Sequence, residues 1–285
     1  MTTTTEQSSA DAVAHLLPTC PHCGRQIRLF EPQARQCMEE LERIGQTMPG
    51  VRDTITRITY WCEECYAVEV ARRKREAFQA HVRRLTKRTY NDGLLPHEAE
   101  LCTFEDSRLA VENRNPAAWT FARKTPLPTN LWIHGAPGTG KTYLCRCVLN
   151  AALERGQTVA ECTAAWINAT GRRFTAQDDV KRYLEPDMLL IDDMDKPAWH
   201  ADGVQLLQHL LNKRHDNNRR LLVTANANPA AVQGFLRHAR ADNASIATAI
   251  MERMIPITRL ELTGDSIRRD EQADMMDAAK EDECG

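Results

Sequence analysis

The chain has 285 residues, more than one typical domain and fewer than two full-sized ones, and its net charge of -2 favours no class of partner. Its beginning has neither the basic nor the apolar region of an export signal, and no uncharged apolar stretch is long enough to span a bilayer. We therefore expect a cytoplasmic protein without a membrane partner, in which the ten cysteines are thiols or metal ligands rather than disulfides.

The amino-terminal part divides into a tail and a small module. Residues 1–19 are rich in Thr, Ser and Ala, which predicts a disordered tail. Apolar residues recur at helical spacing over residues 31–46, and the run 55–61 suits a strand. A long basic helix then extends to about Tyr90, and Asn-Asp-Gly followed by a proline marks a linker. We predict that residues 20–98 form a small helical module that includes this linker.

Two cysteine pairs lie within this module. Each pair has the spacing C-x-x-C, whose short turn lets both sulfurs face one ion, and four thiolates complete a tetrahedral zinc site. The four sulfurs would come from Cys20, Cys23, Cys62 and Cys65. His22 or Cys37 could replace one ligand, although Cys37 on its helix also fits a buried core residue. We expect one structural Zn²⁺, because a module with few large apolar groups gains stability from a metal.

From residue 99 the pattern changes to strands that alternate with helices, which predicts an α/β fold with helices on both faces of a parallel sheet. The predicted strands are 130–134, 158–162, 188–192, 220–224 and 257–262. The predicted helices are 141–154, 175–184, 201–214, 228–239 and 243–254. Residues 99–269 therefore form one α/β domain, and the acidic residues 270–285 form a solvated tail.

A phosphate-binding pattern lies between the first strand and the first helix of these lists. It matches G-x-x-x-x-G-K-[ST], in which glycines let backbone N–H groups wrap phosphates at the start of a helix. Lys141 adds positive charge toward the β and γ phosphates, and the Thr142 hydroxyl can ligate Mg²⁺. The loop consists of Gly135, Ala136, Pro137, Gly138, Thr139, Gly140, Lys141 and Thr142. The pattern predicts ATP binding.

Polar residues end two further strands of the predicted sheet. A buried apolar strand leads into Asp192, which would hold Mg²⁺ through water, and Asp193, which would orient or deprotonate the attacking water. Asn226 follows the next strand at the edge where open α/β sheets bind ligands, although asparagine there is also a common turn former. Asp187 and Asp195 are assigned to the surface. Together with the P-loop, these residues predict an ATPase.

With these motifs in order, the segment from about residue 103 to 269 resembles the AAA+ ATPases of the DnaC/IstB group, which comprises bacterial replicative helicase loaders and transposition ATPases. The resemblance covers a little over half of the chain. Beyond the P-loop it rests on Leu-Ile-Asp-Asp-Met at 190–194, Thr-Ala-Asn at 224–226, Met-Glu-Arg-Met at 251–254 and Gly-Asp-Ser-Ile-Arg at 264–268. It implies a P-loop AAA+ fold for this domain.

The resemblance also implies roles for single residues. Asn226 would be the sensor of the site, and Arg253 an arginine finger that reaches the nucleotide of a neighbouring subunit, which requires self-association. The alternative for Arg253 is a surface helix arginine, and Arg268 is an equally arguable nucleotide-sensing residue. Arg172 and Arg173 could contact DNA phosphates or be solvated.

Two features depart from the family pattern. Many AAA+ proteins have glutamate where this chain has the shorter Asp193, which predicts slow hydrolysis. The stretch from Ala164 to Arg182 is short for the extra helix that such loaders use on single-stranded DNA.

The resemblance implies an ATP-dependent loader of a hexameric replicative helicase onto single-stranded DNA, with the amino-terminal module gripping the helicase. One alternative is an IstB-type transposition ATPase acting on duplex DNA. A second is a non-hydrolysing zinc DNA-binding adaptor with a nucleotide switch. The basic helix fits either a protein partner or nucleic acid.

Overall fold

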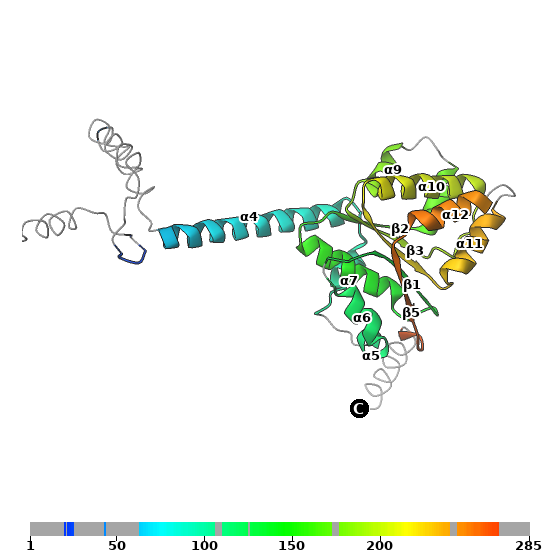
Figure 1. Ribbon diagram of the computed structural model, residues 1–285, viewed down its shortest axis with the longest axis horizontal. Coiled ribbons are helices and arrows are strands. Elements are labelled where there is room, and N and C mark those ends of the chain that lie inside the picture. The colour runs from blue at the N-terminus through cyan, green and yellow to red at the C-terminus, as the bar shows by residue number, and fades with distance from the viewer. Residues whose placement is uncertain are drawn as a thin grey trace, which may run out of the picture. The chain divides into compact units, whose positions relative to one another are not determined.

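The computed structural model describes residues 20, 22–25, 43, 63–105, 110–124, 126–172, 177–239 and 244–267 (Figure 1). The chain forms two compact units, residues 1–79 and 80–285. Both predicted tails and the predicted strand at 55–61 lie outside the described residues, and of the predicted helix at 31–46 only Arg43 is described, as helical.

Helix α4 (Glu63–Asn91) is the long basic helix that the sequence predicts. Its sequence contains neither glycine nor proline, and oppositely charged side chains pair along it. Glu69 accepts hydrogen bonds from Arg72 at 2.7 Å and from Arg73 at 2.6 Å, and Arg72 also donates to Glu76 at 2.6 Å. Pairs three and four residues apart stabilise a helix, so α4 persists although few of its residues are buried.

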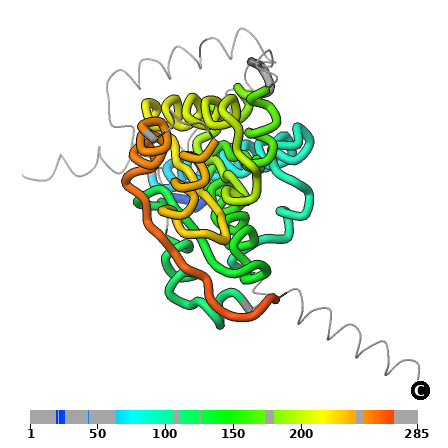
Figure 2. The backbone as a smooth tube through the Cα atoms, turned by 90° about the vertical axis from the view of Figure 1, so that its right-hand side faces the viewer, coloured from blue at the N-terminus to red at the C-terminus, as the bar shows by residue number. Residues whose placement is uncertain are grey.

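The second unit contains a five-stranded parallel sheet with the order β2-β3-β4-β1-β5. The strands are β1 (Asn130–Gly135), β2 (Val159–Thr163), β3 (Met188–Asp192), β4 (Arg220–Ala225) and β5 (Ile257–Leu262). All five were predicted to within one residue at each end. β5, drawn in orange to red in Figure 2, forms one edge of the sheet.

Helices cover both faces of this sheet (Figures 1 and 2). One face carries η1 (His97–Leu101), α5 (Ala110–Arg114), α6 (Pro116–Ala122) and α7 (Lys141–Glu154). The other carries α8 (Ala164–Gly171), α9 (Gln177–Leu184), α10 (Ala201–Asp216), α11 (Pro229–His238) and α12 (Ala244–Arg253). Alternate residues of a strand face opposite layers, so Leu131 and Ile133 join one hydrophobic core and Trp132 joins the other. The predicted α/β class is confirmed.

The stretch from Ala164 to Arg182 contains one helix that was predicted and one that was not. It contains α8 and most of α9, separated by residues 173–176, which lie outside the described residues. The Thr163 hydroxyl caps α8 by accepting the Trp166 N–H at 3.1 Å, and α8 packs along α10. The sequence pattern missed α8 because it starts directly at the end of β2 without a turn.

The segment that follows α4 packs on the back of α7. Buried Asn150 on α7 accepts the Tyr90 hydroxyl at 2.9 Å and donates to the carbonyls of Ala99 at 2.6 Å and Cys102 at 2.8 Å. The Leu94 carbonyl accepts the Glu161 N–H of β2 at 2.8 Å, which gives this edge strand a partner. The residues after α4 are therefore an integral part of the second unit.

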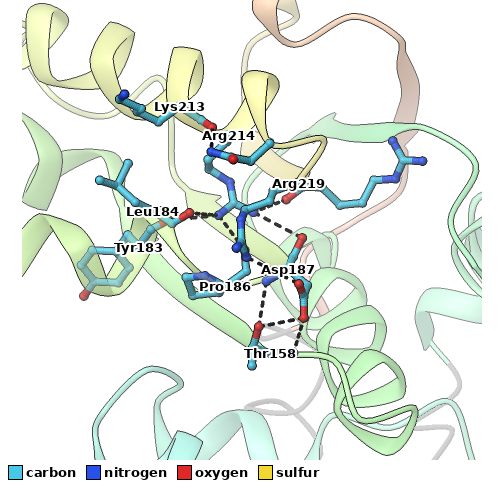
Figure 3. A network of polar contacts seen from close by, with 10 residues as sticks. Thr158, Tyr183, Leu184, Pro186, Asp187, Lys213, Arg214 and Arg219 are labelled. Carbon is cyan, nitrogen blue, oxygen red and sulfur yellow. Dashed lines mark hydrogen bonds and ion pairs between the residues drawn. The ribbon is translucent and has the colours of Figure 1, made fainter.

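A buried arginine organises the amino-terminal edge of the sheet (Figure 3). Arg214 on α10 is 1% exposed and donates to backbone carbonyls at the end of α9 and at the starts of β3 and β4. These carbonyls belong to Tyr183, Leu184, Pro186, Asp187 and Arg220. Burial, with Arg219 nearby, lowers the pKa of Arg214 to about 9. The guanidinium thus fixes the turn that leads into β3.

Among the described residues, no helix combines the length and the apolar character that a bilayer crossing requires.

Candidate nucleotide-binding site

The P-loop joins the end of β1 to the start of α7, at the edge where the parallel strands end. Gly138 and Gly140 have φ angles of 83° and 91°, in the left-handed region that favours glycine. A Cβ atom on Gly138 would lie 2.1 Å from the Ser266 Oγ. The backbone conformation and the close approach of Ser266 therefore both require glycine at position 138.

Lys141 is folded back into this loop. Its Nζ donates to the carbonyls of Gly135 at 2.9 Å and Ala136 at 2.7 Å, and the Thr139 hydroxyl also donates to the Ala136 carbonyl at 2.9 Å. Burial lowers the pKa of the Lys141 ammonium, and the charge of Asp193 partly opposes this shift. A polyanion in the loop would offer the ammonium stronger acceptors than neutral carbonyls.

Thr142 and Asp192 meet beside the loop. The Thr142 hydroxyl on α7 donates to Asp192 Oδ1 at 2.9 Å, and Thr224 on β4 donates to the same oxygen. Hydroxyl and carboxylate oxygens are the ligands that a hard divalent cation prefers. The predicted Mg²⁺ ligands are therefore brought together.

Asp193 directly follows β3 in a left-handed conformation, with φ at 57°. Its N–H donates to the Thr224 hydroxyl at 3.0 Å, and its side chain is half-buried. Burial, and next the charge of Asp192, raise the pKa of the Asp193 carboxyl. A carboxylate with a raised pKa at the mouth of a phosphate loop can accept a proton from an attacking water.

Asn226 follows β4 at the same edge and is half-buried. Its N–H donates to Asp195 Oδ2 at 3.0 Å, and the Ala227 N–H donates to the same oxygen at 3.2 Å. The surface assignment of Asp195 is therefore wrong, because this half-buried carboxylate holds the backbone that carries Asn226.

Asp187 lies at the surface as predicted, with its side chain 48% exposed, and it accepts the Thr158 N–H at 2.9 Å and the Thr158 hydroxyl at 2.8 Å. It belongs to the opposite edge of the sheet, where β3 begins.

The residues after β5 close over the P-loop. The Ile267 N–H donates to the Gly138 carbonyl at 3.0 Å, and Arg114 donates to the Asp265 carbonyl at 2.8 Å. Asn115 accepts the Thr263 N–H at 2.9 Å, which joins this segment to the start of α6. Arg268 itself lies outside the described residues, but the residue before it contacts the phosphate loop.

Sequence reasoning gave Thr224 and Asn115 no role in the site. Thr224 is fully buried and its neighbours in β4 are apolar, so a polar residue at the end of an apolar strand was the available signal. Asn115 gave no comparable signal, because asparagine before a proline is typical of ordinary turns.

Arg253 does not join this site within one chain. It ends α12, is exposed, and donates from Nε to Asn212 Oδ1 at 3.0 Å. Arg253 shares a small hollow with Asn130 and Arg220, which begin β1 and β4, so it lies at the edge opposite the P-loop.

Of the two predicted DNA contacts, Arg172 alone is among the described residues. Arg172 is exposed at the end of α8, and Arg173 lies outside the described residues.

Three predicted zinc ligands gather in the first unit. Sulfur atoms of Cys20, Cys23 and Cys65 all lie within 4.8 Å of one another, while Cys62 and Cys37 lie outside the described residues. The Gly24 N–H donates to the Cys20 carbonyl at 2.8 Å, which forms a tight turn around the first pair. His22 is exposed and is not part of this group of three thiols. The donor set suits a tetrahedral metal that prefers sulfur.

Comparison with known proteins places this geometry in a family. A family model described as IstB-like ATP binding protein matches residues 69–274. The chromosomal replication initiator protein DnaA of Aliarcobacter butzleri is 29% identical over 128 residues, which cover 42% of this chain and 28% of that protein. DnaA of Bacteroides thetaiotaomicron is 26% identical over 131 residues, which cover 43% of this chain and 26% of that protein. The chain thus spans about a quarter of these relatives.

Two solved structures are similar to this chain at low sequence identity. The crystal structure of DnaI matches 60% of this chain and 93% of that chain with a TM-score of 0.49 and 20% identity. AMPPCP-bound DnaA from Aquifex aeolicus matches 61% of this chain and 52% of that chain with a TM-score of 0.45 and 19% identity. Because the family model covers well over half of the chain and its P-loop is intact, the protein belongs to the IstB-like ATP-binding family.

Proposed function

We propose that this ATPase loads a hexameric replicative helicase onto single-stranded DNA. The observation that carries the proposal is the group of three cysteine side chains in the first unit, because it precedes residue 69, where the family match begins. A module added ahead of a shared ATPase is suited to hold a specific partner. The sequence relatives that act as chromosomal replication initiators support a role in replication.

The chemistry of the site follows from its residues. Lys141 and the P-loop N–H groups bind the phosphates, and Thr142 and Asp192 hold Mg²⁺, which neutralises phosphate charge when bound. Asp193 orients the attacking water and accepts its proton, and Asn226 orients the water from β4. Asp193 is short and sits on a fixed backbone, so hydrolysis is slow and ATP-bound assemblies persist.

Arg253 acts on the nucleotide of a neighbouring subunit. Its place at the edge opposite the P-loop supports action in trans, because it lies away from the nucleotide of its own chain. Its guanidinium stabilises transition-state charge only when subunits assemble, so hydrolysis reports assembly. Arg268 would contact the nucleotide, and Arg172 and Arg173 would contact DNA phosphates.

The amino-terminal unit holds one Zn²⁺ through Cys20, Cys23, Cys62 and Cys65. Three of these sulfurs already lie close together, and Arg25 beside the turn pairs with Glu64 at the start of α4. The metal would therefore anchor the turn to the beginning of the long helix, within the first unit.

A second candidate function is a transposition ATPase that acts on duplex DNA, which the description of the matching family favours. The two candidates share every ATPase residue and differ in the nucleic acid that stimulates them. A non-hydrolysing adaptor differs from both, since it would bind ATP without turnover.

ATPase rates measured with no DNA, single-stranded DNA and duplex DNA, at several protein concentrations and with a replicative helicase added, test these alternatives. For a loader, we expect the rate per subunit to rise with concentration and with single-stranded DNA. Preferential stimulation by duplex DNA would favour the transposition ATPase. The absence of ATP turnover under every condition would favour the non-hydrolysing adaptor.

Replacing Arg253 tests action in trans. We expect Arg253→Ala to lower assembled turnover by about 100-fold or more while ATP affinity stays unchanged. Arg237→Ala, an exposed arginine on α11, is the matched control. A variant that keeps the wild-type rate would remove Arg253 from the site. Mixing Arg253→Ala with Lys141→Ala subunits should restore part of the activity, because each supplies what the other lacks.

A further inference from the structure

One hydroxyl joins the two acids of the ATPase site. Thr224 lies at the end of β4, is fully buried, and belongs to no phosphate or metal motif. Its Oγ1 donates to Asp192 Oδ1 and accepts the Asp193 N–H at 3.0 Å. Its own carbonyl accepts the Met194 N–H at 2.8 Å. Three consecutive residues, the last one of β3 and the two that follow it, are thus held by one residue of β4.

We propose that Thr224 is a positioning residue that fixes the positions of the metal ligand Asp192 and the proposed base Asp193 relative to each other. A threonine hydroxyl has one hydrogen to donate and lone pairs to accept, and here it uses both functions on adjacent residues. No apolar side chain of the same shape can do this. The inference rests on the ATPase site, and not on the identity of the helicase or DNA partner.

The backbone conformation of Asp193 shows why it needs a stabilising hydrogen bond. Its φ of 57° is uncommon for a residue other than glycine and costs free energy unless neighbouring contacts fix it. The Thr224 hydroxyl supplies such a contact at the N–H of this residue. Without it, Asp193 can relax toward an ordinary conformation, which would move its carboxylate away from the P-loop.

The same hydroxyl restrains Asp192. Asp192 Oδ1 accepts hydrogen bonds from Thr142 on α7 and Thr224 on β4, so the carboxylate is fixed from two sides before any cation binds. Partners of this kind orient metal ligands, and their removal typically lowers metal affinity or activity by about 10- to 100-fold.

The test is nucleotide affinity with and without Mg²⁺, measured by a fluorescent ATP analogue with the full-length protein. We expect Thr224→Val to reduce the gain in affinity that Mg²⁺ gives by about tenfold or more, and to leave affinity in EDTA within about twofold of wild type. Turnover should fall in parallel, and Thr224→Ser should restore both. Thr258→Val on β5 is the matched control, because its hydroxyl bonds only Thr129 among the described contacts, at 2.7 Å.

The possible outcomes separate the hypotheses. If Thr224→Val lowers the melting temperature but keeps the wild-type gain from Mg²⁺, Thr224 is merely structural and the inference is overturned. If Mg²⁺ fails to strengthen nucleotide binding in the wild type, the metal role of Asp192 and the inference fall together. If only stimulation by helicase and DNA is missing, the loader proposal fails while the role of Thr224 stands.

Discussion

The two edges of the same parallel sheet use buried polar groups in opposite ways. At the carboxyl edge, Asp193 and Asn226 are half-buried, and Asp193 has a left-handed backbone. At the amino edge, Arg214 is 1% exposed. Its guanidinium donates hydrogen bonds to backbone carbonyls, as Figure 3 shows. At the carboxyl edge, polar side chains stay available to bind a ligand. At the amino edge, the hydrogen-bond donors of the buried side chain already bind the backbone and stabilise the fold.

The contrast leads to opposite expectations for substitutions. A change at the carboxyl edge should alter nucleotide chemistry and leave stability nearly unchanged. A change at the amino edge should lower stability and leave the nucleotide site intact. Substitutions at each edge therefore test whether the two edges differ in this way.

The largest effect is expected at Lys141. Lys141→Ala removes the ammonium that faces the phosphates, and we expect ATP turnover to fall by at least about 100-fold. The free energy of unfolding without nucleotide should change by about 1 kcal/mol or less, because the lost hydrogen bonds to carbonyls are offset by relief of a buried charge. Steady-state kinetics and urea unfolding measure the two quantities.

Lys181→Ala is the matched control for this variant, since Lys181 on α9 is largely exposed. It should change neither quantity. A Lys141→Ala protein that is destabilised by several kcal/mol would show that the lysine also supports the fold, and the contrast between the edges would weaken.

The carboxyl edge could be predicted from the sequence because ligand chemistry demands particular residues at fixed spacing. Gly140, Lys141 and Thr142 follow the first strand, and Asp192 ends the third, so strand ends located the site. The five strands were found for a related reason, since buried parallel strands form short apolar runs.

The remaining features depend on contacts between distant parts of the chain. Thr224 meets Asp192 and Asp193 only because β3 and β4 are neighbours in the sheet. Asp195 was assigned to the surface because its hydrogen bonds to Asn226 and Ala227 join two separate loops. Arg214 resembles any helix arginine in sequence, and its burial follows from the turn before β3, which no local pattern describes.

The amino edge should respond in the opposite sense to Lys141. Arg214→Met keeps much of the side-chain volume but leaves buried carbonyls of Tyr183, Pro186 and Arg220 without their donor. We expect a loss of about 3 kcal/mol in the free energy of unfolding. Nucleotide affinity measured well below the melting temperature should stay within about twofold of wild type, because none of these contacts reaches the P-loop.

Lys213→Met is the control for Arg214→Met, because it lies one position earlier on α10 with an exposed side chain. Its expected change is below about 0.5 kcal/mol. If Arg214→Met retained wild-type stability, the carbonyls would have found other partners and the guanidinium would not organise this edge. If it instead abolished nucleotide binding while stable, the two edges would be coupled through the sheet.

The smallest expected effect is the pH dependence that Asp193 gives to the carboxyl edge. Burial and the charge of Asp192 raise the pKa of this carboxyl above the ordinary value of 3.8. Turnover requires the carboxylate, so the rate should rise as pH rises through this raised pKa and then level off. Asp193→Asn should turn over slowly and lack this rise, and a full-length protein that stays folded across the range makes the comparison valid.

The same shift fixes the sign of a stability change. A carboxyl with a raised pKa in the folded state binds its proton more tightly there than in the unfolded chain, so the contribution of Asp193 to stability falls as pH rises from below 3.8 through the raised pKa. Relative to wild type, Asp193→Asn should therefore melt at a slightly higher temperature at neutral pH, and this advantage should shrink as acid protonates Asp193. Melting temperatures of both proteins across pH test this, and a variant that is less stable than wild type at neutral pH would show that Asp193 supports the fold rather than only the chemistry of this edge.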